Sequence, residues 1–128
     1  MSVARGGLLL ALLLVAGCGK ESTAGLIEKL KAPEAGTRLI AARNLGQRPA
    51  EAAQVVPALA EALMDEDEEV RKAAAFSLGA LGERAREAVP ALREAQRDRA
   101  ADVRKAASVA LSYIDPDRFP PTGKAKGK

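Results

Sequence analysis

The sequence contains no histidine, no tryptophan and a single cysteine, Cys18, among its 128 residues. A catalytic dyad built on His, a zinc site built on Cys and His, and an intramolecular disulfide are therefore all excluded. Aromatic side chains are scarce as well, because the chain has only two Phe and one Tyr. These absences argue against most enzyme classes, and we expect neither a catalytic residue nor a cofactor or metal.

The residues that favour strands, which are β-branched or aromatic, are also few, whereas 28 residues are Ala and 16 are Leu. This composition suits close-packed helices and predicts an all-α fold. The 20 Lys and Arg are interspersed with 17 Asp and Glu to give a net charge of +3. A balance this small does not indicate nucleic-acid binding by itself. The length is sufficient for one small domain.

The first seventeen residues have the layout of a secretory signal peptide. Arg5 provides a positive charge, and an apolar run over 8–16 (LLLALLLVA) follows it. Counted from Gly6 to Cys18, the apolar or small stretch would form about 20 Å of helix, against a hydrocarbon core of about 30 Å. It is too short to span a bilayer comfortably, so we expect residues 1–17 to be a targeting signal.

The end of this signal reads Val15-Ala16-Gly17-Cys18. These residues resemble the lipobox of bacterial lipoproteins, with the only cysteine at the position that the motif requires. The resemblance implies cleavage between Gly17 and Cys18 and attachment of a diacylglyceryl group to the Cys18 thiol, usually with a third acyl chain on the new amino terminus. Two or three chains are enough for stable anchoring in a lipid bilayer. The alternative is an ordinary signal peptide or an uncleaved anchor in which Cys18 is only a small apolar residue.

The localisation that these features predict is export, with a lipid anchor at the bacterial cell membrane. Gly19, rather than Asp, follows the cysteine, which by family resemblance slightly favours the periplasmic side of the outer membrane in a host with two membranes. We expect residues 18–23 to be the lipidated amino terminus and a short tether.

The rest of the chain repeats itself with a period of 33 residues. Residues 56–81 (VPALAEALMDEDEEVRKAAAFSLGAL) align without a gap on residues 89–114 (VPALREAQRDRAADVRKAASVALSYI), and the same offset reaches back to residues 26–46. Three repeats, over about 22–49, 55–82 and 88–115, fill a domain at 24–115. A fixed period of this size is typical of a solenoid, whose units bury their apolar faces only against neighbouring units.

Each repeat is predicted to be a pair of helices. The first helix is expected to open with Pro57 or Pro90, because proline suits the first helical turn. The second is expected over about 68–82, with an apolar stripe at helical spacing and with Gly82 as its C-terminal cap. The sequence therefore predicts a short α-solenoid of three helix pairs.

The pattern D-x-x-x-x-V-R-x-A-A occurs at residues 65–74 and again at residues 98–107. It is similar to the short HEAT-like repeats, including those of the bilin-lyase type. The first repeat departs from it, with Ala32 where the second has Asp65, and resembles a degenerate amino-terminal cap. The resemblance implies the solenoid fold but hardly any particular function, since one scaffold serves many tasks.

Asp65, Arg71, Asp98 and Arg104 recur at the 33-residue period. Catalysis requires one asymmetric, desolvated constellation rather than one copy in each repeat. We therefore interpret these residues as a structural ladder, in which the acids cap a turn or a helix and the arginines pair with them across repeats.

A candidate contact surface follows from the resemblance, because the second helices of HEAT arrays usually line the concave face. The helical angle places Lys72, Ala75, Phe76 and Gly79 opposite the apolar stripe of the second repeat. The proposed partner-binding positions combine an apolar centre with a basic rim: Leu39, Arg43, Lys72, Phe76, Lys105 and Val109. Phe76 has two interpretations, as the anchor of that surface or as ordinary packing between repeats.

The helical pattern stops at Asp115, and two prolines follow it at 120 and 121. Residues 116–128 end in a series of lysines and glycines and are predicted to form a flexible basic tail.

These features favour a non-enzymatic lipoprotein that acts as a protein–protein interaction scaffold in the cell envelope, binding another protein through the concave face. One alternative is a chromophore-handling enzyme similar to the bilin lyases, although the lack of His argues against it. Another is a nucleic-acid-binding HEAT module, should the chain not be exported. We expect neither a nucleic-acid partner nor a small-molecule substrate, since export removes the former and no site for the latter is evident.

Overall fold

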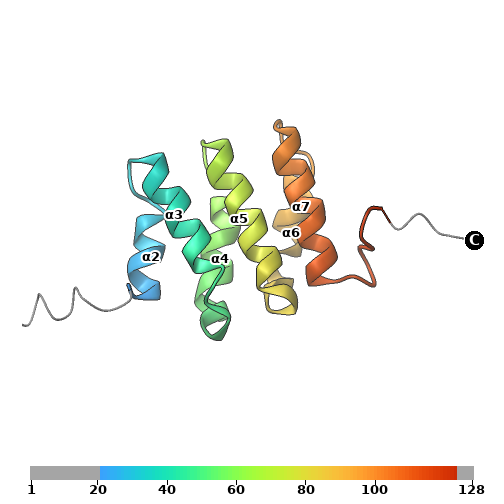
Figure 1. Ribbon diagram of the computed structural model, residues 1–128, viewed down its shortest axis with the longest axis horizontal. Coiled ribbons are helices and arrows are strands. Elements are labelled where there is room, and N and C mark those ends of the chain that lie inside the picture. Colours follow the sequence, from blue (N-terminus) through green and yellow to red (C-terminus); the bar gives the residue numbers. More distant parts are fainter. Residues whose placement is uncertain (1–20, 124–128) are drawn as a thin grey trace, which may run out of the picture.

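The computed structural model describes residues 21–123 and is all-helical, with no strand in that range (Figure 1). The elements follow one another along the chain as α2 (Thr23–Lys29), α3 (Ala35–Leu45), η1 (Pro49–Glu51), α4 (Ala52–Ala62), α5 (Glu68–Ala80), η2 (Gly82–Ala88), α6 (Val89–Ala95) and α7 (Ala101–Ile114). None of the helices in this range is long and apolar enough to cross a bilayer.

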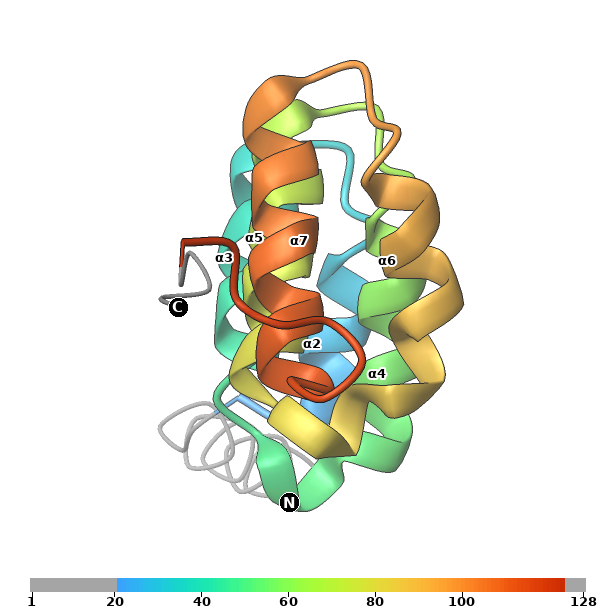
Figure 2. The same ribbon diagram turned by 90° about the vertical axis from the view of Figure 1, so that its right-hand side faces the viewer.

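The helices form two layers. The first helices of the repeats, α2, α4 and α6, lie in one layer, and the second helices, α3, α5 and α7, lie side by side in the other (Figures 1 and 2). Each pair stacks on the next, so α5 packs against both α3 and α7. The predicted α-solenoid of three helix-pair repeats is confirmed.

The core consists of apolar side chains that recur at the period of the sequence. Leu26, Leu59 and Leu92 occupy equivalent positions on the first helices and are at most 1% exposed. The second helices bury a matching row, at Leu45, Leu78 and Leu111, with no exposed surface. Because every repeat places the same leucines against its neighbour, no single repeat has a core of its own.

The helix starts differ from the prediction in the second repeat. Pro90 stands in the first turn of α6, but Pro57 lies inside α4, which begins five residues earlier at Ala52. Proline cannot donate the hydrogen bond that would reach the carbonyl of Ala53. Both residues are exposed, so water can satisfy that carbonyl and the helix continues through the proline.

Glycine has a defined role at the end of α5 and between the second helices. Gly82 has a φ of +57°, the left-handed conformation that ends a helix, as the sequence predicts. Gly46 lies so close to α5 that a Cβ atom there would be 2.9 Å from the backbone Cα of Ser77. Gly79 is in the equivalent position against α7, where a Cβ would be 3.0 Å from the Cα of Ala110. The missing side chains therefore let the second helices approach each other closely.

At both ends, the folded domain extends beyond the predicted range of 24–115. At the amino-terminal side, Thr23 is 3% exposed, and its hydroxyl accepts a hydrogen bond of 2.9 Å from Arg48, which also binds the carbonyl of Glu21. The fold therefore begins by Glu21, inside the stretch predicted to be a tether.

At the other side, the first residues of the predicted tail lie against the domain. A turn follows α7, and the half-buried ring of Phe119 packs against the core. The backbone N–H of Phe119 also donates a 2.8 Å hydrogen bond to the carbonyl of Asp115, which closes the turn. The remaining predictions for the termini, namely the signal peptide, Gly17, Cys18 and the last lysines, lie outside the described residues.

Candidate functional site

The repeated arginines and aspartates meet across the junction between the second and third repeats. Arg71 is 4% exposed and binds the Asp98 carboxylate through two hydrogen bonds, 2.9 Å from Nε to Oδ2 and 3.1 Å from Nη2 to Oδ1. Its Nη1 donates to the carbonyl oxygens of Asp65 and Glu66, at 2.9 and 3.1 Å. One buried guanidinium thus ties the turn of its own repeat to the turn of the next repeat.

The junction between the first and second repeats has the same geometry. Arg38 binds Asp65 at 2.9 and 3.1 Å, and its Nη1 donates to the carbonyls of Ala32 and Pro33. In the third repeat, Arg104 keeps only the contacts with its own turn, at 2.8 and 3.2 Å, and is exposed. The ladder therefore ends with the array, because no further repeat supplies a carboxylate within the described residues.

The electrostatics of the second junction follow from this geometry. Burial of the Asp98 carboxyl opposes its ionisation, but the hydrogen bonds from Arg71 and from the backbone of Ala100, together with the charges of Arg71 and Arg99, outweigh that cost. The net effect lowers the pKa of Asp98 below its ordinary value. Asp98 is therefore an ionised structural acceptor at neutral pH and not a proton donor.

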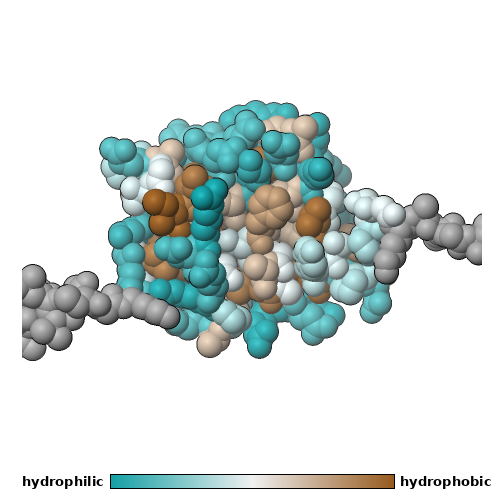
Figure 3. Space-filling model, in the orientation of Figure 1, coloured by the Kyte–Doolittle hydropathy of each residue, from teal (hydrophilic) through white to brown (hydrophobic). Residues whose placement is uncertain are grey.

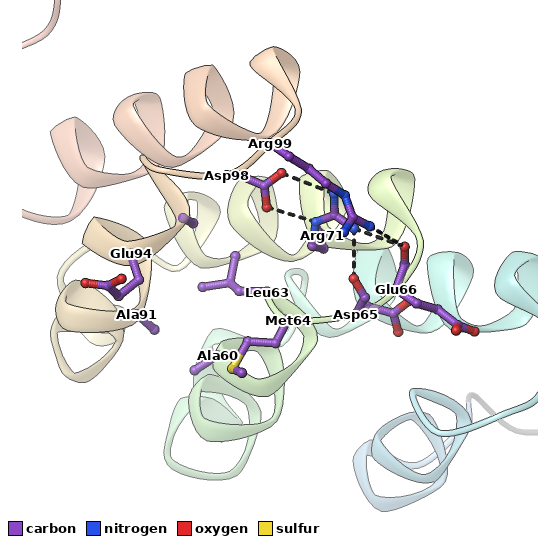
Figure 4. Close-up of a pocket in the computed structure, with 11 residues that line it drawn as sticks. Ala60, Leu63, Met64, Asp65, Glu66, Arg71, Ala91, Glu94, Asp98 and Arg99 are labelled. Atoms are coloured by element: carbon purple, nitrogen blue, oxygen red, sulfur yellow. Dashed lines mark hydrogen bonds and ion pairs between the residues drawn. The ribbon is translucent and has the colours of Figure 1, made fainter.

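A cavity of about 580 Å³ lies beside this ladder, between α4 and α6 (Figure 4). Figure 4 shows the guanidinium of Arg71 directed at Asp98 and at the turn of Asp65 and Glu66, with Met64 below them. The charged groups of the ladder are thus engaged with one another, whereas Glu94 on the far side of the cavity pairs with Arg97. Among residues 21–123 no group of three or more side chains could hold a metal ion.

The opposite side of the molecule, formed by α3, α5 and α7, exposes apolar side chains. Phe76 on α5 is 51% exposed and Tyr113 on α7 is 67% exposed. Figure 3 shows hydrophobic patches over each of the three helices, with a hydrophilic column between the patches on α3 and α5. We refer to this side as the second-helix face.

Two grooves divide the second-helix face, one on each side of a ridge formed by Phe76 and Ala80. The groove between α3 and α5, called here the polar groove, encloses about 350 Å³. Its polar lining side chains are Arg43, Gln47, Glu69, Lys72 and Ser77.

The charges in the polar groove are unequal. Lys72 donates a hydrogen bond of 2.9 Å to Glu69, which raises the pKa of Lys72 despite partial desolvation. Arg43 is exposed and forms no ion pair with any other described residue. The groove thus presents one unneutralised cation beside the Gln47 amide.

The groove between α5 and α7, called here the apolar groove, encloses about 340 Å³. The rings of Phe76 and Tyr113 line it together with Val109, and Gly79 and Ala110 belong to the closely packed helices beneath. No charged side chain lines this groove. The two grooves share one ridge but offer opposite chemistry.

The structure brings four of the six predicted contact residues to these grooves. Arg43, Lys72, Phe76 and Val109 line one or both of them, whereas Leu39 packs against the core and Lys105 lies outside both grooves. Phe76, for which sequence reasoning left two interpretations, is half exposed on the ridge.

Two further positions assigned to the surface are buried. Ala75 has no exposed surface and Gly79 lies beneath the apolar groove, because α5 has a neighbour on each side as well as α4 below it. Sequence reasoning also missed Tyr113, which stands one helical turn after Val109 and therefore on the same side of α7. The spacing of these two residues was the signal that could have found it.

A protein-family model described as HEAT repeats matches residues 23–112, which is most of the chain. The chain belongs to the HEAT-repeat family. A comparison with curated proteins finds no match to it. HEAT repeats generally mediate protein–protein interactions and are typically non-enzymatic. In this HEAT-repeat domain, the arginine ladder holds the repeats together, and the second-helix face exposes the aromatic rings of Phe76 and Tyr113 beside grooves.

Proposed function

We propose that the protein is a non-enzymatic, lipid-anchored adaptor of the bacterial cell envelope, which binds another protein through its second-helix face. The observation that carries the binding role is the half-exposed Phe76 ridge between two grooves. An aromatic ring exposed beside an apolar groove costs solvation free energy that a partner would recover on binding. The ladder side is a weaker candidate, because the charged groups of the ladder already bind one another.

The anchoring part of the proposal rests on the lipobox resemblance at Cys18. Since the fold begins by Glu21, three residue steps separate the acylated thiol position from the domain, a reach of at most about 11 Å. An anchor of this length would hold the HEAT repeats against the lipid headgroups. The partner would accordingly be a protein at the membrane surface rather than one deep in the periplasm.

Site-specific photo-crosslinking in the native cell tests the binding role. We expect a crosslinker placed at Phe76 to yield a discrete adduct with another protein. The matched control is the same crosslinker at Met64, which is 86% exposed but lies on the ladder side. Equal adducts at both positions, or none at Phe76, would contradict binding through the second-helix face.

The anchor is tested by the intact mass of the protein purified from its membrane fraction, with Cys18→Ser as the control. We expect the wild type to begin at Cys18 and to carry acyl mass that the variant lacks. A full-length, unmodified chain would refute the lipoprotein assignment and would return cytosolic partners, including nucleic acid, to consideration.

A further inference from the structure

The two grooves of the second-helix face have complementary chemistry at a fixed separation. The polar groove offers the guanidinium of Arg43 and the amide of Gln47, and the apolar groove offers Phe76, Val109 and Tyr113. Arg43 has no acidic partner among the described residues, and the only carboxylate lining its groove, that of Glu69, already binds Lys72. A ligand that satisfies both grooves must therefore carry a carboxylate on one side and an apolar group on the other.

The spacing of the grooves follows from the packing of the helices that form them. Neighbouring packed helices lie about 8–10 Å apart, and the glycine contacts at Gly46 and Gly79 indicate close approach in both pairs. Each groove lies between two such helices, so the groove centres are separated by about one interhelical distance. Each groove, at 340 to 350 Å³, is large enough for one or two side chains but not for a helix.

An extended segment in the polyproline II conformation matches this spacing. It rises about 3.1 Å per residue with three residues per turn, so side chains three positions apart lie on the same side, about 9.3 Å from each other. We propose that the second-helix face binds an extended segment of a partner protein, and that this segment carries an acidic and an aliphatic residue three positions apart. The proposal rests on the adaptor function proposed above. The acid enters the polar groove and binds Arg43, the aliphatic side chain enters the apolar groove, and the intervening backbone crosses the ridge of Phe76 and Ala80.

Labelled peptides and the full chain in detergent micelles test this proposal by fluorescence anisotropy. The probes are proline-rich decapeptides with Glu and Leu three positions apart, in both orders, and the controls replace Glu by Gln, replace Leu by Ser, or reduce the spacing to two. We expect one order to bind at least tenfold more tightly than each control. Equal binding of all the peptides would overturn the proposal.

Three protein variants identify the grooves, and all three change exposed or half-exposed side chains, so the fold is retained. We expect Arg43→Glu to reduce the affinity for the Glu peptide at least tenfold and to leave the lower affinity for the Gln peptide unchanged. Val109→Asp should reduce the affinity for the Leu peptide at least tenfold and leave the affinity for the Ser peptide unchanged. Met64→Glu, the matched control on the ladder side, should alter nothing. Loss of that selectivity in either groove variant would overturn the assignment of that groove.

A helical probe separates this proposal from the adaptor function on which it rests. Residues seven positions apart on a helix also lie about 10.5 Å apart on one face. Tighter binding by a helical peptide with Glu and Leu seven apart would overturn the extended segment but leave the second-helix face as the binding surface. If no peptide binds and the crosslinker at Phe76 still forms its adduct, the proposed extended segment with its acidic and aliphatic residues is wrong and the adaptor function stands. The absence of both signals would refute both.

Discussion

The protein has two junctions between repeats, one between the first and second repeats and one between the second and third. Their buried contacts are alike, but their exposed surfaces differ. Inside, Arg38 binds Asp65 and Arg71 binds Asp98 at the same pair of distances, 2.9 and 3.1 Å. Outside, the same junctions carry the polar groove and the apolar groove. Identical buried contacts thus support two surfaces of opposite character.

The walls of the two grooves come from equivalent positions of the repeat. On one wall, Arg43 and Gln47 of the polar groove correspond to Phe76 and Ala80 of the apolar groove, 33 residues later. On the other wall, the equivalent of Ala80 is Tyr113. The positions that stay constant hold the array together, and the positions that vary make the two grooves differ in chemistry.

The largest expected effect breaks the inside of one junction. Arg71→Met leaves the Asp98 carboxylate, whose side chain is 11% exposed, without its counter-charge and removes four hydrogen bonds. We expect the free energy of unfolding, measured by urea denaturation, to fall by about 3–5 kcal/mol.

Two further variants show whether that loss comes from the junction. Arg104→Met removes contacts with one turn only and should cost much less. Arg71→Met combined with Asp98→Leu should recover most of the loss, because no unpaired charge remains. Equal losses for Arg71→Met and Arg104→Met would show that the turn contacts, and not the pairing between repeats, carry the stability.

The second prediction compares the close approach of the helices at the two junctions. A Cβ at Gly46 would lie 2.6 to 2.9 Å from three atoms of Ser77, so Gly46→Ala must push α5 away. We expect a loss of about 1–3 kcal/mol in the free energy of unfolding. Gly79→Ala should cost less, because its nearest contacts are 3.0 and 3.2 Å from Ala110.

Gly36 provides the control for helix propensity. Nothing lies within 4 Å of a Cβ at this position of α3, so Gly36→Ala should stabilise the chain by about 0.5 kcal/mol. If Gly46→Ala also stabilised the chain, the junction would be able to open without cost, and close approach would not be what fixes the spacing of the grooves.

The repeated part of the fold was predictable because burial in a solenoid recurs with the sequence. The 33-residue period located the helix pairs, and the recurring Asp and Arg located a ladder whose partners the structure brings together. Period and chemistry were sufficient at the two junctions because equivalent residues meet the same surroundings there, whereas Arg104 at the end of the array has no carboxylate partner among the described residues.

Features that depend on a single position were less predictable. Helical periodicity placed Ala75 and Gly79 opposite the core stripe, but it describes one face of one helix and not the neighbours on either side of α5. Phe119 was assigned to a flexible tail because no local pattern shows that a ring after Pro116 returns to the core. Tyr113 was missed because the groove that it lines exists only once α5 and α7 are packed.

The third prediction concerns pH and the charge at the second junction. The pKa of Asp98 is lower in the folded chain than in the unfolded chain, where an Asp has a pKa of about 3.9. The contribution of Asp98 to the free energy of unfolding is therefore fully present above the unfolded pKa. It is lost as pH falls through the folded pKa. We expect the free energy of unfolding to decline below about pH 4, and to decline less steeply in Asp98→Asn. Parallel curves for the two proteins between pH 2 and pH 7 would contradict the assigned role of this carboxylate.

The smallest expected effect on stability comes from making the two grooves alike on the outside. Phe76→Arg combined with Ala80→Gln gives the apolar groove the same wall as the polar groove. Both original side chains are exposed, Arg and Gln are good helix formers, and the Arg stem can cover the surface that the ring covered. We expect the free energy of unfolding to change by less than about 1 kcal/mol, whereas a crosslinker placed at Tyr113, which lines the same groove, should lose its adduct with the partner. The proposed function assigns stability to the repeated interior and binding to the varied exterior, so a large loss of stability here would mean that Phe76 is packing between repeats and not a contact residue.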